Sequence, residues 1–426
     1  MAVKKWVLAG SAVLLLVVLG AGYYQFQKTE PLSADAQALI ATVQYPEYQA
    51  NLSNRNFFMA AGIEAATDKE AEELGRLRYH RSWQLLAKGS VNEEELNQDT
   101  DIKKYLEPAV ILSSSDKRFL KEYRVAINRS ESLPFIKNKQ TEMIGLVNKF
   151  SAQIDRYAKI YNQDYQDLPI SALGLTLPNT INLLDMHTLL LAKITLSSET
   201  PAVKIQQSHQ YLAGLRQVEV VSALNLITQS QNLRRMEQTI NIINELAVAE
   251  SIAVREITPL TPQEMSVKNV LVGEMLYRYR DTGNVSQTEF RKKIPKEVSM
   301  NQLTAAILPV IELSELSYSN MLPILAQGVN SKPYSPPIKY LRYKSILDIK
   351  SESNDFIKYA IAPRIVDYRI HLFNAIQSGL SVSELNAQDT YGQYTEEGQK
   401  LCLELPKEFK AQYESNAALC LMRPVK

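Results

Sequence analysis

Apolar side chains recur at every third or fourth position along most of the chain after Ser33, which is the spacing of one face of an α-helix. This pattern predicts helices over 67–88, 114–129, 137–165, 178–197, 219–250, 262–279, 299–327 and 355–378. The first of them begins at Thr67-Asp68-Lys69-Glu70, which has the spacing of a capping box. The sequence therefore predicts a mainly α fold, built as an irregular multi-helix domain.

The segment 219–250 has the most regular pattern. Leu226, Leu233, Ile240 and Ala247 recur every seven residues, as they do along the seam of a coiled coil. The seam is too short for a coiled coil that is stable by itself. We expect a helix that packs against neighbours in its own domain. The alternative is a helix that binds a partner or a second copy of the chain.

The end of the chain changes to short apolar runs. The segment 400–405 is followed by Pro406, and the segment 418–422 is followed, one residue later, by Pro424. Together the two segments predict a small C-terminal β-hairpin. They carry the two cysteines of the chain, Cys402 and Cys420. In an oxidising compartment, two cysteines on facing strands would form a disulfide. The alternative is a pair of buried free thiols.

An uncharged segment runs from Trp6 to Phe26, directly after Lys4 and Lys5. As a helix it spans roughly 30 Å, about the thickness of one hydrocarbon core. It predicts an N-terminal transmembrane helix, and the lysines favour an N-terminus in the cytoplasm. The residues predicted to lie in the membrane include Val7, Leu14, Leu15, Leu16, Leu19 and Gly22.

The alternative for this segment is a signal peptide cleaved among the small residues 20–22. Leu19 would then occupy a place that cleavage sites reserve for small residues, so a retained anchor is favoured. The predicted organisation is a cytoplasmic and transmembrane part (1–27), a helical extracytoplasmic domain (28–380) and a C-terminal segment with two short strands (381–426). The predicted location is the inner membrane of a bacterium, crossed once, with the C-terminal domain in the periplasm.

Composition excludes several classes of protein. Lys and Arg total 47 and Asp and Glu total 46, so there is no basic field that would draw nucleic acid. Apolar residues make up 45% of the chain, which is enough to bury a substantial core, and only 15 glycines and 18 prolines occur, which favours helices over a turn-rich β fold. Two cysteines are too few for a disulfide-rich framework or a cysteine zinc cluster.

Catalytic and metal-binding motifs are absent from the sequence. The histidines His80, His187, His209 and His371 show no metal-ligand spacing, and there is no phosphate-binding loop or nucleophile elbow. Asp185 lies two residues before His187 in a predicted helix, so their side chains point about 200° apart and do not share a face. We therefore predict no catalytic residue, no cofactor and no metal.

Basic residues form two local clusters. Lys117, Lys121 and Arg124 share one face of a predicted helix, and a second group surrounds the segment 281–295. The second group consists of Arg278, Arg280, Arg291, Lys292, Lys293 and Lys296. Either cluster could meet anionic lipid headgroups or an acidic partner. The alternative is an ordinary solvated surface.

Three stretches resemble a group of uncharacterised membrane-anchored proteins of Gram-negative bacteria. They are residues 56–63 (NFFMAAGI), the segment 220–246, and Tyr368-Arg369-Ile370 in a helix after a proline. The Asn-Pro-[Ile/Val]-Gly motif of many such proteins is missing here. The resemblance implies a membrane helix followed by a helical extracytoplasmic domain, and it brings no activity and no site residues.

Together these patterns predict a membrane-anchored protein that acts by binding other envelope proteins or itself. One alternative is an envelope hydrolase whose carboxylates are brought together only by the fold. Another is a carrier of lipid or another apolar ligand, because the helix predicted over 178–197 is strongly apolar.

Overall fold

The computed structural model describes residues 30–42, 53–87, 93–107, 110–162, 180–221, 226–281, 296–330, 349–388, 391–413 and 418–424. The predicted transmembrane helix, with Val7, Leu14, Leu15, Leu16, Leu19 and Gly22, lies outside the described residues. Among the helices that are described, none combines the length and the apolar character that crossing a bilayer requires.

The first four helices after residue 53 form what we call the N-terminal lobe. They are α3 (Arg55–Ala61), α4 (Asp68–Ala87), α5 (Glu93–Gln98) and α6 (Thr100–Leu106). The predicted capping box is confirmed, since the Glu70 amide donates to the Thr67 hydroxyl at 3.2 Å and the Thr67 amide donates to the Glu70 carboxylate at 2.9 Å. Helices α3 and α4 pack so closely that a Cβ added at Gly75 would lie 2.0 Å from the Phe58 carbonyl oxygen. Only glycine fits at this position.

The next seven helices form the central bundle. They are α7 (Ser114–Asn128), α8 (Ser132–Asn138), α9 (Gln140–Lys149), α10 (Ser151–Asn162), α11 (Thr180–Leu196), α12 (Pro201–Val221) and α13 (Leu226–Ala249). The single helix predicted over 137–165 is wrong, because Lys139 and Phe150 leave the helical range with φ of −120° and −106°. The apolar spacing continues across both breaks since α9 and α10 face the same core, and periodicity alone therefore hides the bends.

The remaining elements form the C-terminal layer. They are α14 (Pro262–Met265), α15 (Lys268–Asp281), α16 (Lys296–Ser314), α17 (Tyr318–Gln327), α18 (Ile349–Gln377), α19 (Val382–Gln388), β1 (Tyr394–Glu397), β2 (Lys400–Glu404), α20 (Lys407–Tyr413) and β3 (Ala418–Met422). Helix α2 (Ala34–Ala41) joins this layer from the other end of the chain. The Asn301 side chain on α16 holds it, accepting from the Ser33 amide at 2.7 Å and donating to the Pro31 carbonyl at 2.9 Å.

The predicted C-terminal hairpin is part of a three-stranded antiparallel sheet with the order β1-β2-β3. Strand β1 escaped prediction because Tyr394 is its one buried residue, so it lacks the apolar run that marked the other two strands. Gly398, with a φ of 63°, closes the turn between β1 and β2. The Asn386 side chain binds both the amide and the carbonyl of Tyr394, at 2.7 and 3.1 Å, as a neighbouring strand would.

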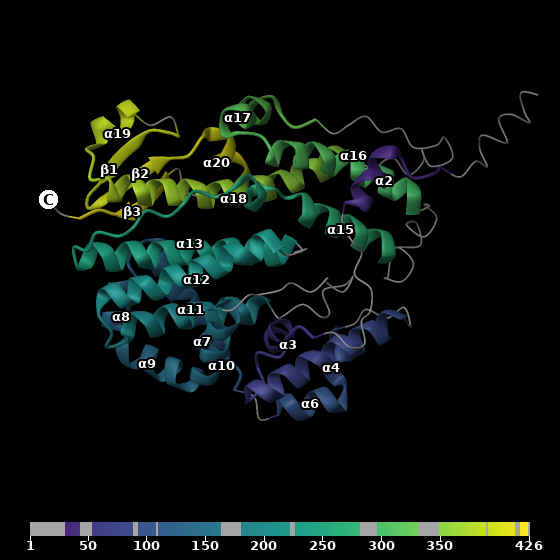
Figure 1. Cartoon of the computed structure of the whole chain (residues 1–426), viewed down its shortest axis with the longest axis horizontal. Coiled ribbons are helices and arrows are strands. Elements are labelled where there is room, and N and C mark those ends of the chain that lie inside the picture. The colour runs from purple at the N-terminus through teal and green to yellow at the C-terminus, as the bar shows by residue number, and fades with distance from the viewer. Residues whose placement is uncertain are drawn as a thin grey trace, which may run out of the picture.

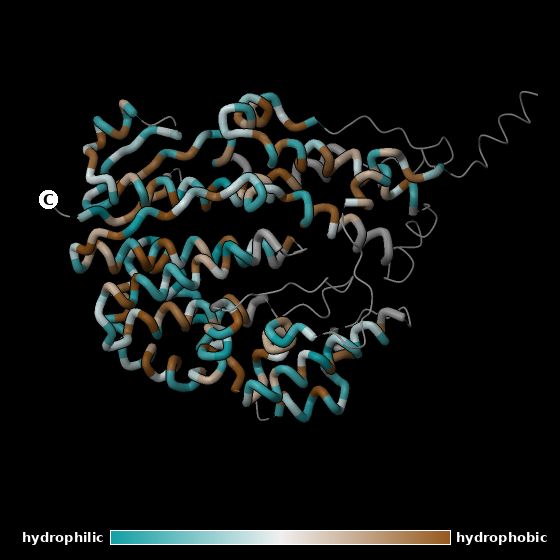
Figure 2. The backbone as a smooth tube through the Cα atoms, viewed as in Figure 1, coloured by the Kyte–Doolittle hydropathy of each residue, from teal (hydrophilic) through white to brown (hydrophobic). Residues whose placement is uncertain are grey.

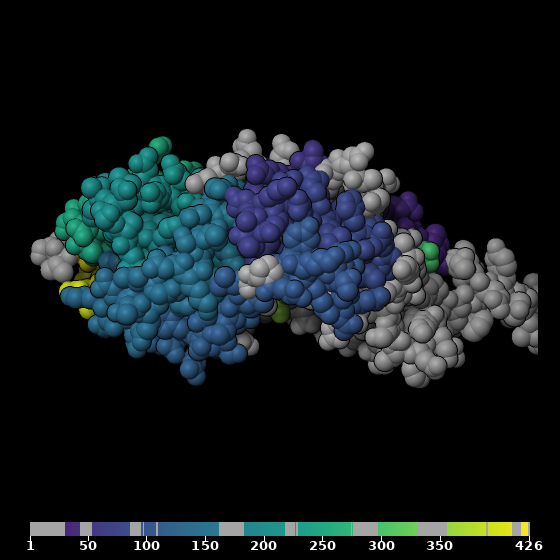
Figure 3. All heavy atoms as spheres, turned by 90° about the horizontal axis from the view of Figure 1, so that it is seen from below, coloured from purple at the N-terminus to yellow at the C-terminus, as the bar shows by residue number. Residues whose placement is uncertain are grey.

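One hydrophobic core runs through the central bundle and the C-terminal layer, from Leu39 to Leu421. The segment 381–426 therefore shares its core with the helices that precede it. The N-terminal lobe adds a few residues of α3 to this core and has a small core of its own, made of Ala65, Ala71, Leu74, Leu96 and Ile102. Seen from below, the lobe lies beside the bundle helices rather than over them (Figure 3).

Helix α13 lies in the middle of the molecule (Figure 1). It packs against α7, α8, α11 and α12 of the bundle and against α15, α18 and β3 of the C-terminal layer. Most of this helix is enclosed by protein, although Arg234 is exposed, so a polar side chain that is buried on it can find a partner only inside the protein.

Candidate functional site

The central helix α13 carries many buried polar side chains. They are Gln229, Asn232, Arg235, Gln238, Thr239, Asn241, Asn244 and Glu245, and none is more than 4% exposed. Figure 2 shows hydrophilic positions interspersed with hydrophobic ones along this helix, although it lies in the interior. Because such groups are costly to bury without partners, α13 is the first place to look for a site.

His187 reaches α13 from α11. Its Nδ1 lies 3.2 Å from the Tyr157 hydroxyl, and its Nε2 lies 3.1 Å from both the Thr239 hydroxyl and the Arg235 carbonyl oxygen. Burial, with the charge of Arg235, lowers the pKa of His187 from 6.5 to about 3, so the imidazole is neutral near neutral pH. The ring is fully buried and joins α10, α11 and α13. This arrangement suits a structural role better than proton transfer with a substrate.

The guanidinium of Arg235 belongs to the same cluster. Its Nη1 donates to the Tyr161 hydroxyl at 2.6 Å and to the Tyr157 hydroxyl at 3.2 Å, and its Cζ lies 5.1 Å from the centre of the Tyr161 ring. Burial alone would lower the pKa of Arg235, but the two tyrosines outweigh it and the pKa is raised. Within the described part of the chain, this buried cation is therefore held by hydroxyls and an aromatic face rather than by a carboxylate.

Asp185 contacts a different helix from His187, which confirms that the two do not act together. Its carboxylate lies 2.5 Å from Nη1 of Arg124 on α7. Burial raises the pKa of Asp185, and Arg124 opposes that rise. Arg124, one residue of the first basic cluster, is therefore paired with a carboxylate. The other two residues of that cluster, Lys117 and Lys121, are exposed. The side chains of the second basic cluster lie outside the described residues.

The regular seam of α13 packs within this chain. Leu226, Leu233, Ile240 and Ala247 are 8%, 3%, 0% and 3% exposed, and all four belong to the large core. This supports the expectation of a helix that packs in its own domain. Helix α11, expected from its apolar run, is buried in the same core.

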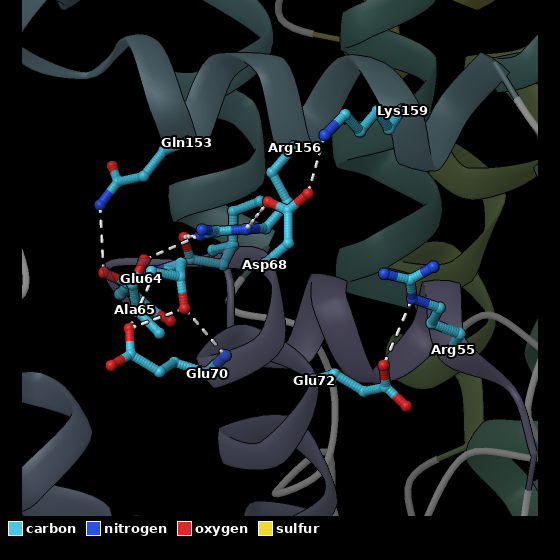
Figure 4. A network of polar contacts seen from close by, with 11 residues as sticks. Arg55, Glu64, Ala65, Asp68, Glu70, Glu72, Gln153, Arg156 and Lys159 are labelled. Carbon is cyan, nitrogen blue, oxygen red and sulfur yellow. Dashed lines mark hydrogen bonds and ion pairs between the residues drawn. The ribbon is translucent and has the colours of Figure 1, made fainter.

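A second polar cluster joins the N-terminal lobe to the bundle (Figure 4). Arg156 on α10 is fully buried, and its Nε donates to the Asp68 carboxylate at 3.1 Å. Its Nη1 donates to the carbonyl oxygens of Ile63 and Ala65 at 2.6 and 2.9 Å. Lys159, one turn further along α10, binds the other carboxylate oxygen of Asp68 at 2.8 Å. The two basic side chains thus hold the loop between α3 and α4.

Gln153 extends this joint by donating to the carbonyl oxygens of Glu64 and Val110, at 3.1 and 2.9 Å. Burial would raise the pKa of Asp68, but its bonds to basic side chains outweigh that effect and lower the pKa. Burial lowers the pKa of Arg156, and Asp68 opposes this. The donors of Arg156, Lys159 and Gln153 end on the Asp68 carboxylate and on backbone carbonyls, so the cluster forms a joint between two parts of the fold.

A third set of polar contacts fixes the extended segment 252–261, which runs along α18. The Asn374 side chain binds the amide and the carbonyl of Ile257 at 2.9 and 2.8 Å, and the Asp367 carboxylate accepts from the Leu260 amide at 2.8 Å. Burial raises the pKa of Asp367, and the Leu260 amide opposes this. The segment has no regular secondary structure, so these side chains replace the hydrogen bonds that a helix or sheet would supply.

The C-terminal sheet holds a disulfide between Cys402 and Cys420, which face one another on β2 and β3. Glu397 on β1 completes the one group of three potential metal ligands within 4.8 Å of one another that the described residues contain. In this group the sulfur atoms of Cys402 and Cys420 are bonded to each other, so neither is a thiolate that could bind a metal ion.

The four histidines lie on four different helices. His80 is on α4, His187 on α11, His209 on α12 and His371 on α18. The His371 ring stacks on Tyr391 with their centres 4.0 Å apart.

Arg156, Arg235 and Glu245 were not singled out by sequence analysis. Each is a charged residue set among apolar positions at helical spacing, and that signal is visible in the sequence. The partners are not visible, because they come from the loop between α3 and α4, from α10 and from α8.

Comparison of the chain with protein-family models, with curated protein sequences and with solved structures found no match. Function is therefore inferred from the contacts described above. The resemblance to membrane-anchored proteins of Gram-negative bacteria remains a prediction.

Proposed function

We propose that this protein is a binding or assembly factor of the bacterial cell envelope, held in the inner membrane by residues 1–27 with its helical domain in the periplasm. Its partners are other envelope proteins or a second copy of the chain. This role calls for a rigid body that presents an outer surface, and it needs no reaction centre.

The observation that carries the proposal is how the buried ionisable groups are used. His187 and Arg235 join three helices of the bundle, and Arg156 joins the lobe to α10. Each of these side chains is at most 2% exposed. Groups placed in this way stabilise the fold, and a substrate would have to displace part of the core to reach them.

The disulfide supports the proposed compartment. Bonds such as Cys402–Cys420 persist in oxidising environments and are rare in the cytosol. The uncharged segment from Trp6 to Phe26, with lysines before it, is the feature that would place the rest of the chain across the membrane.

The location is tested by fractionation of the native host. The full chain is expected in the membrane fraction, and a chain that lacks residues 1–27 is expected in the soluble fraction. Cys402 and Cys420 should resist a membrane-permeant alkylating reagent until a reductant is added. Full-length protein in the soluble fraction, or cysteines that react without reductant, would contradict the placement.

Binding is tested by cross-linking in intact cells, followed by mild detergent extraction and measurement of particle mass. We expect a stoichiometric complex heavier than one 48.1 kDa chain. An excess of the soluble chain that lacks residues 1–27 should compete for the partner and dissociate that complex. A full-length chain that remains a monomer under these conditions, with no cross-linked partner, would overturn the proposal.

A further inference from the structure

The turn between α7 and α8 is held against the second half of α13. The Asn241 side chain donates to the Ile127 carbonyl oxygen at the end of α7, at 2.9 Å. One turn further along α13, the Glu245 carboxylate accepts from the Leu133 amide at the start of α8, at 3.1 Å. Two neighbouring side chains of α13 thus fix both sides of one turn.

The same turn is also held by the C-terminal sheet. Lys400 on β2 donates to the Arg129 carbonyl oxygen at 2.7 Å and lies 3.7 Å from the Glu131 carboxylate. Asn244, next to Glu245 on α13, donates to the Met422 carbonyl oxygen on β3 at 3.1 Å. Bundle, central helix and sheet therefore meet at this turn.

Glu245 is a buried carboxyl group whose one hydrogen bond of ordinary geometry comes from the Leu133 amide. It is 4% exposed, and its Oε1 is buried without a hydrogen bond. The hydroxyls of Tyr123 and Ser132 are also buried and make no hydrogen bond of ordinary geometry. An ionised carboxylate here is costly, whereas a protonated one is neutral and has a proton to donate.

The charged and polar groups that act on Glu245 come from several elements. Tyr123 on α7 is itself kept protonated, since burial and then the charge of Glu245 raise its pKa. The Leu133 amide and Ser132 at the start of α8 favour the ionised carboxylate, as does Lys400 on β2. Burial outweighs them and raises the pKa of Glu245 to about 7.

We propose that Glu245 is a proton-operated latch that holds the turn between α7 and α8 to the central helix and the C-terminal sheet. When the carboxyl group is protonated, the turn stays closed on α13. When it ionises, the turn separates from α13 so that water can reach the charge, and Lys400 loses its contact with the Arg129 carbonyl. This latch is a property of the fold and does not depend on the proposed envelope function.

The sign of the pH effect follows from the two pKa values. The closed turn holds its proton up to about pH 7, whereas an exposed glutamate releases it near the ordinary value of 4.5. The open form therefore gains as pH rises from 4.5 and levels off above about pH 7. Between pH 5 and pH 8 we expect the fraction of open turn to rise by on the order of a hundredfold.

The test is hydrogen exchange on the full-length protein in detergent at pH 5, 6, 7 and 8, corrected for the intrinsic pH dependence of exchange. Protection of the amides 131–133, 135 and 419–422 should fall with rising pH in the wild type. Amides of α4 serve as the internal reference and should not follow this curve. Wild-type protection that is constant from pH 5 to pH 8 would sink the proposal by itself, without any variant.

Two variants identify the group responsible. Glu245→Gln keeps the shape of the side chain without its charge, so protection should stay high at every pH. Glu250→Gln removes an exposed carboxylate from the end of the same helix and should keep the wild-type curve. A fall in protection that persists in Glu245→Gln would assign the effect to another group and would overturn the latch.

Discussion

Arg156 and Arg235 are both closed off from solvent, yet they are held in different ways. Arg156, at the joint between lobe and bundle, binds the Asp68 carboxylate and two backbone carbonyls. Arg235, inside the bundle, binds the hydroxyls of Tyr157 and Tyr161 and stacks on one of their rings. The Arg156 guanidinium is paired with a carboxylate, whereas the Arg235 guanidinium binds two neutral hydroxyls and an aromatic ring.

The difference follows from what each arginine holds. The loop between α3 and α4 has carbonyls with no place in a helix, and a charged fork with several donors can bind them together. The Arg235 guanidinium lies inside the bundle, where the groups that it binds are the side-chain hydroxyls of Tyr157 and Tyr161. The polar contacts of the lobe are therefore gathered at one loop, held by Arg156, Lys159 and Gln153, while the bundle spreads its polar contacts along α13.

The largest expected effect comes from removing the charge at the joint. Arg156→Met leaves the carbonyls of Ile63 and Ala65 without their donor, so it should destabilise the lobe by about 3–5 kcal/mol. Trp83 lies in α4, so urea unfolding of the lobe can be followed by its fluorescence once Trp6 is replaced by Phe.

The matched control is Arg55→Met. Arg55 also pairs with a carboxylate of α4, Glu72 at 3.3 Å, but its side chain is 64% exposed. Surface pairs of this kind contribute at most about 1 kcal/mol. Equal losses for the two variants would remove the distinction between the joint and an ordinary surface pair.

Acid should affect the bundle more than the lobe. His187 has a folded-state pKa of about 3 against an ordinary 6.5, so the unfolded chain takes up a proton first and stability falls as pH drops from 6.5 towards 3. At pH 4 this loss amounts to about 3 kcal/mol, which His187→Gln should remove. The measurement is urea unfolding at pH 7 and pH 4, followed by circular dichroism.

His80 on α4 is the control for the acid effect. Its pKa is also lowered by burial and then by Arg76, but the side chain is only partly buried. His80→Gln should change the acid sensitivity of the bundle little. If it protects as well as His187→Gln does, the buried imidazole is not the source of the loss.

The smallest effect is expected at Arg235. Arg235→Met removes two hydrogen bonds but also removes a buried charge that lacks a carboxylate, so the net cost should be about 1–2 kcal/mol. Unfolding by urea, measured beside Arg156→Met, gives the comparison directly. A loss at Arg235 as large as that at Arg156 would show that the two modes of burial are equivalent.

Local patterns were sufficient for many of the helices. The capping box at Thr67 marked the start of α4, and the apolar spacing of 178–197 marked α11, because both signals are formed by residues within a few positions of each other. Strand β1, the bends at Lys139 and Phe150, and the break at 315–317 that divides the single helix predicted over 299–327 into α16 and α17 were missed. Their neighbours in space, rather than in sequence, make those conformations favourable.

The site residues show the same limit. Asp185 and His187 were correctly separated by helical geometry alone, but their partners, Arg124 and Tyr157, lie 61 and 30 residues away along the chain. Pairings across such distances depend on how helices stack, which no local pattern encodes.

By itself, the sequence determined that the chain is mainly helical, that its termini differ in character from its body, and that the motifs of known catalytic sites are missing. The tertiary structure alone decided which charges are buried and what holds them, including the latch at Glu245. The reason is physical: helix formation depends on contacts between residues three or four apart, whereas the pKa and the pairing of a buried group depend on the elements that enclose it.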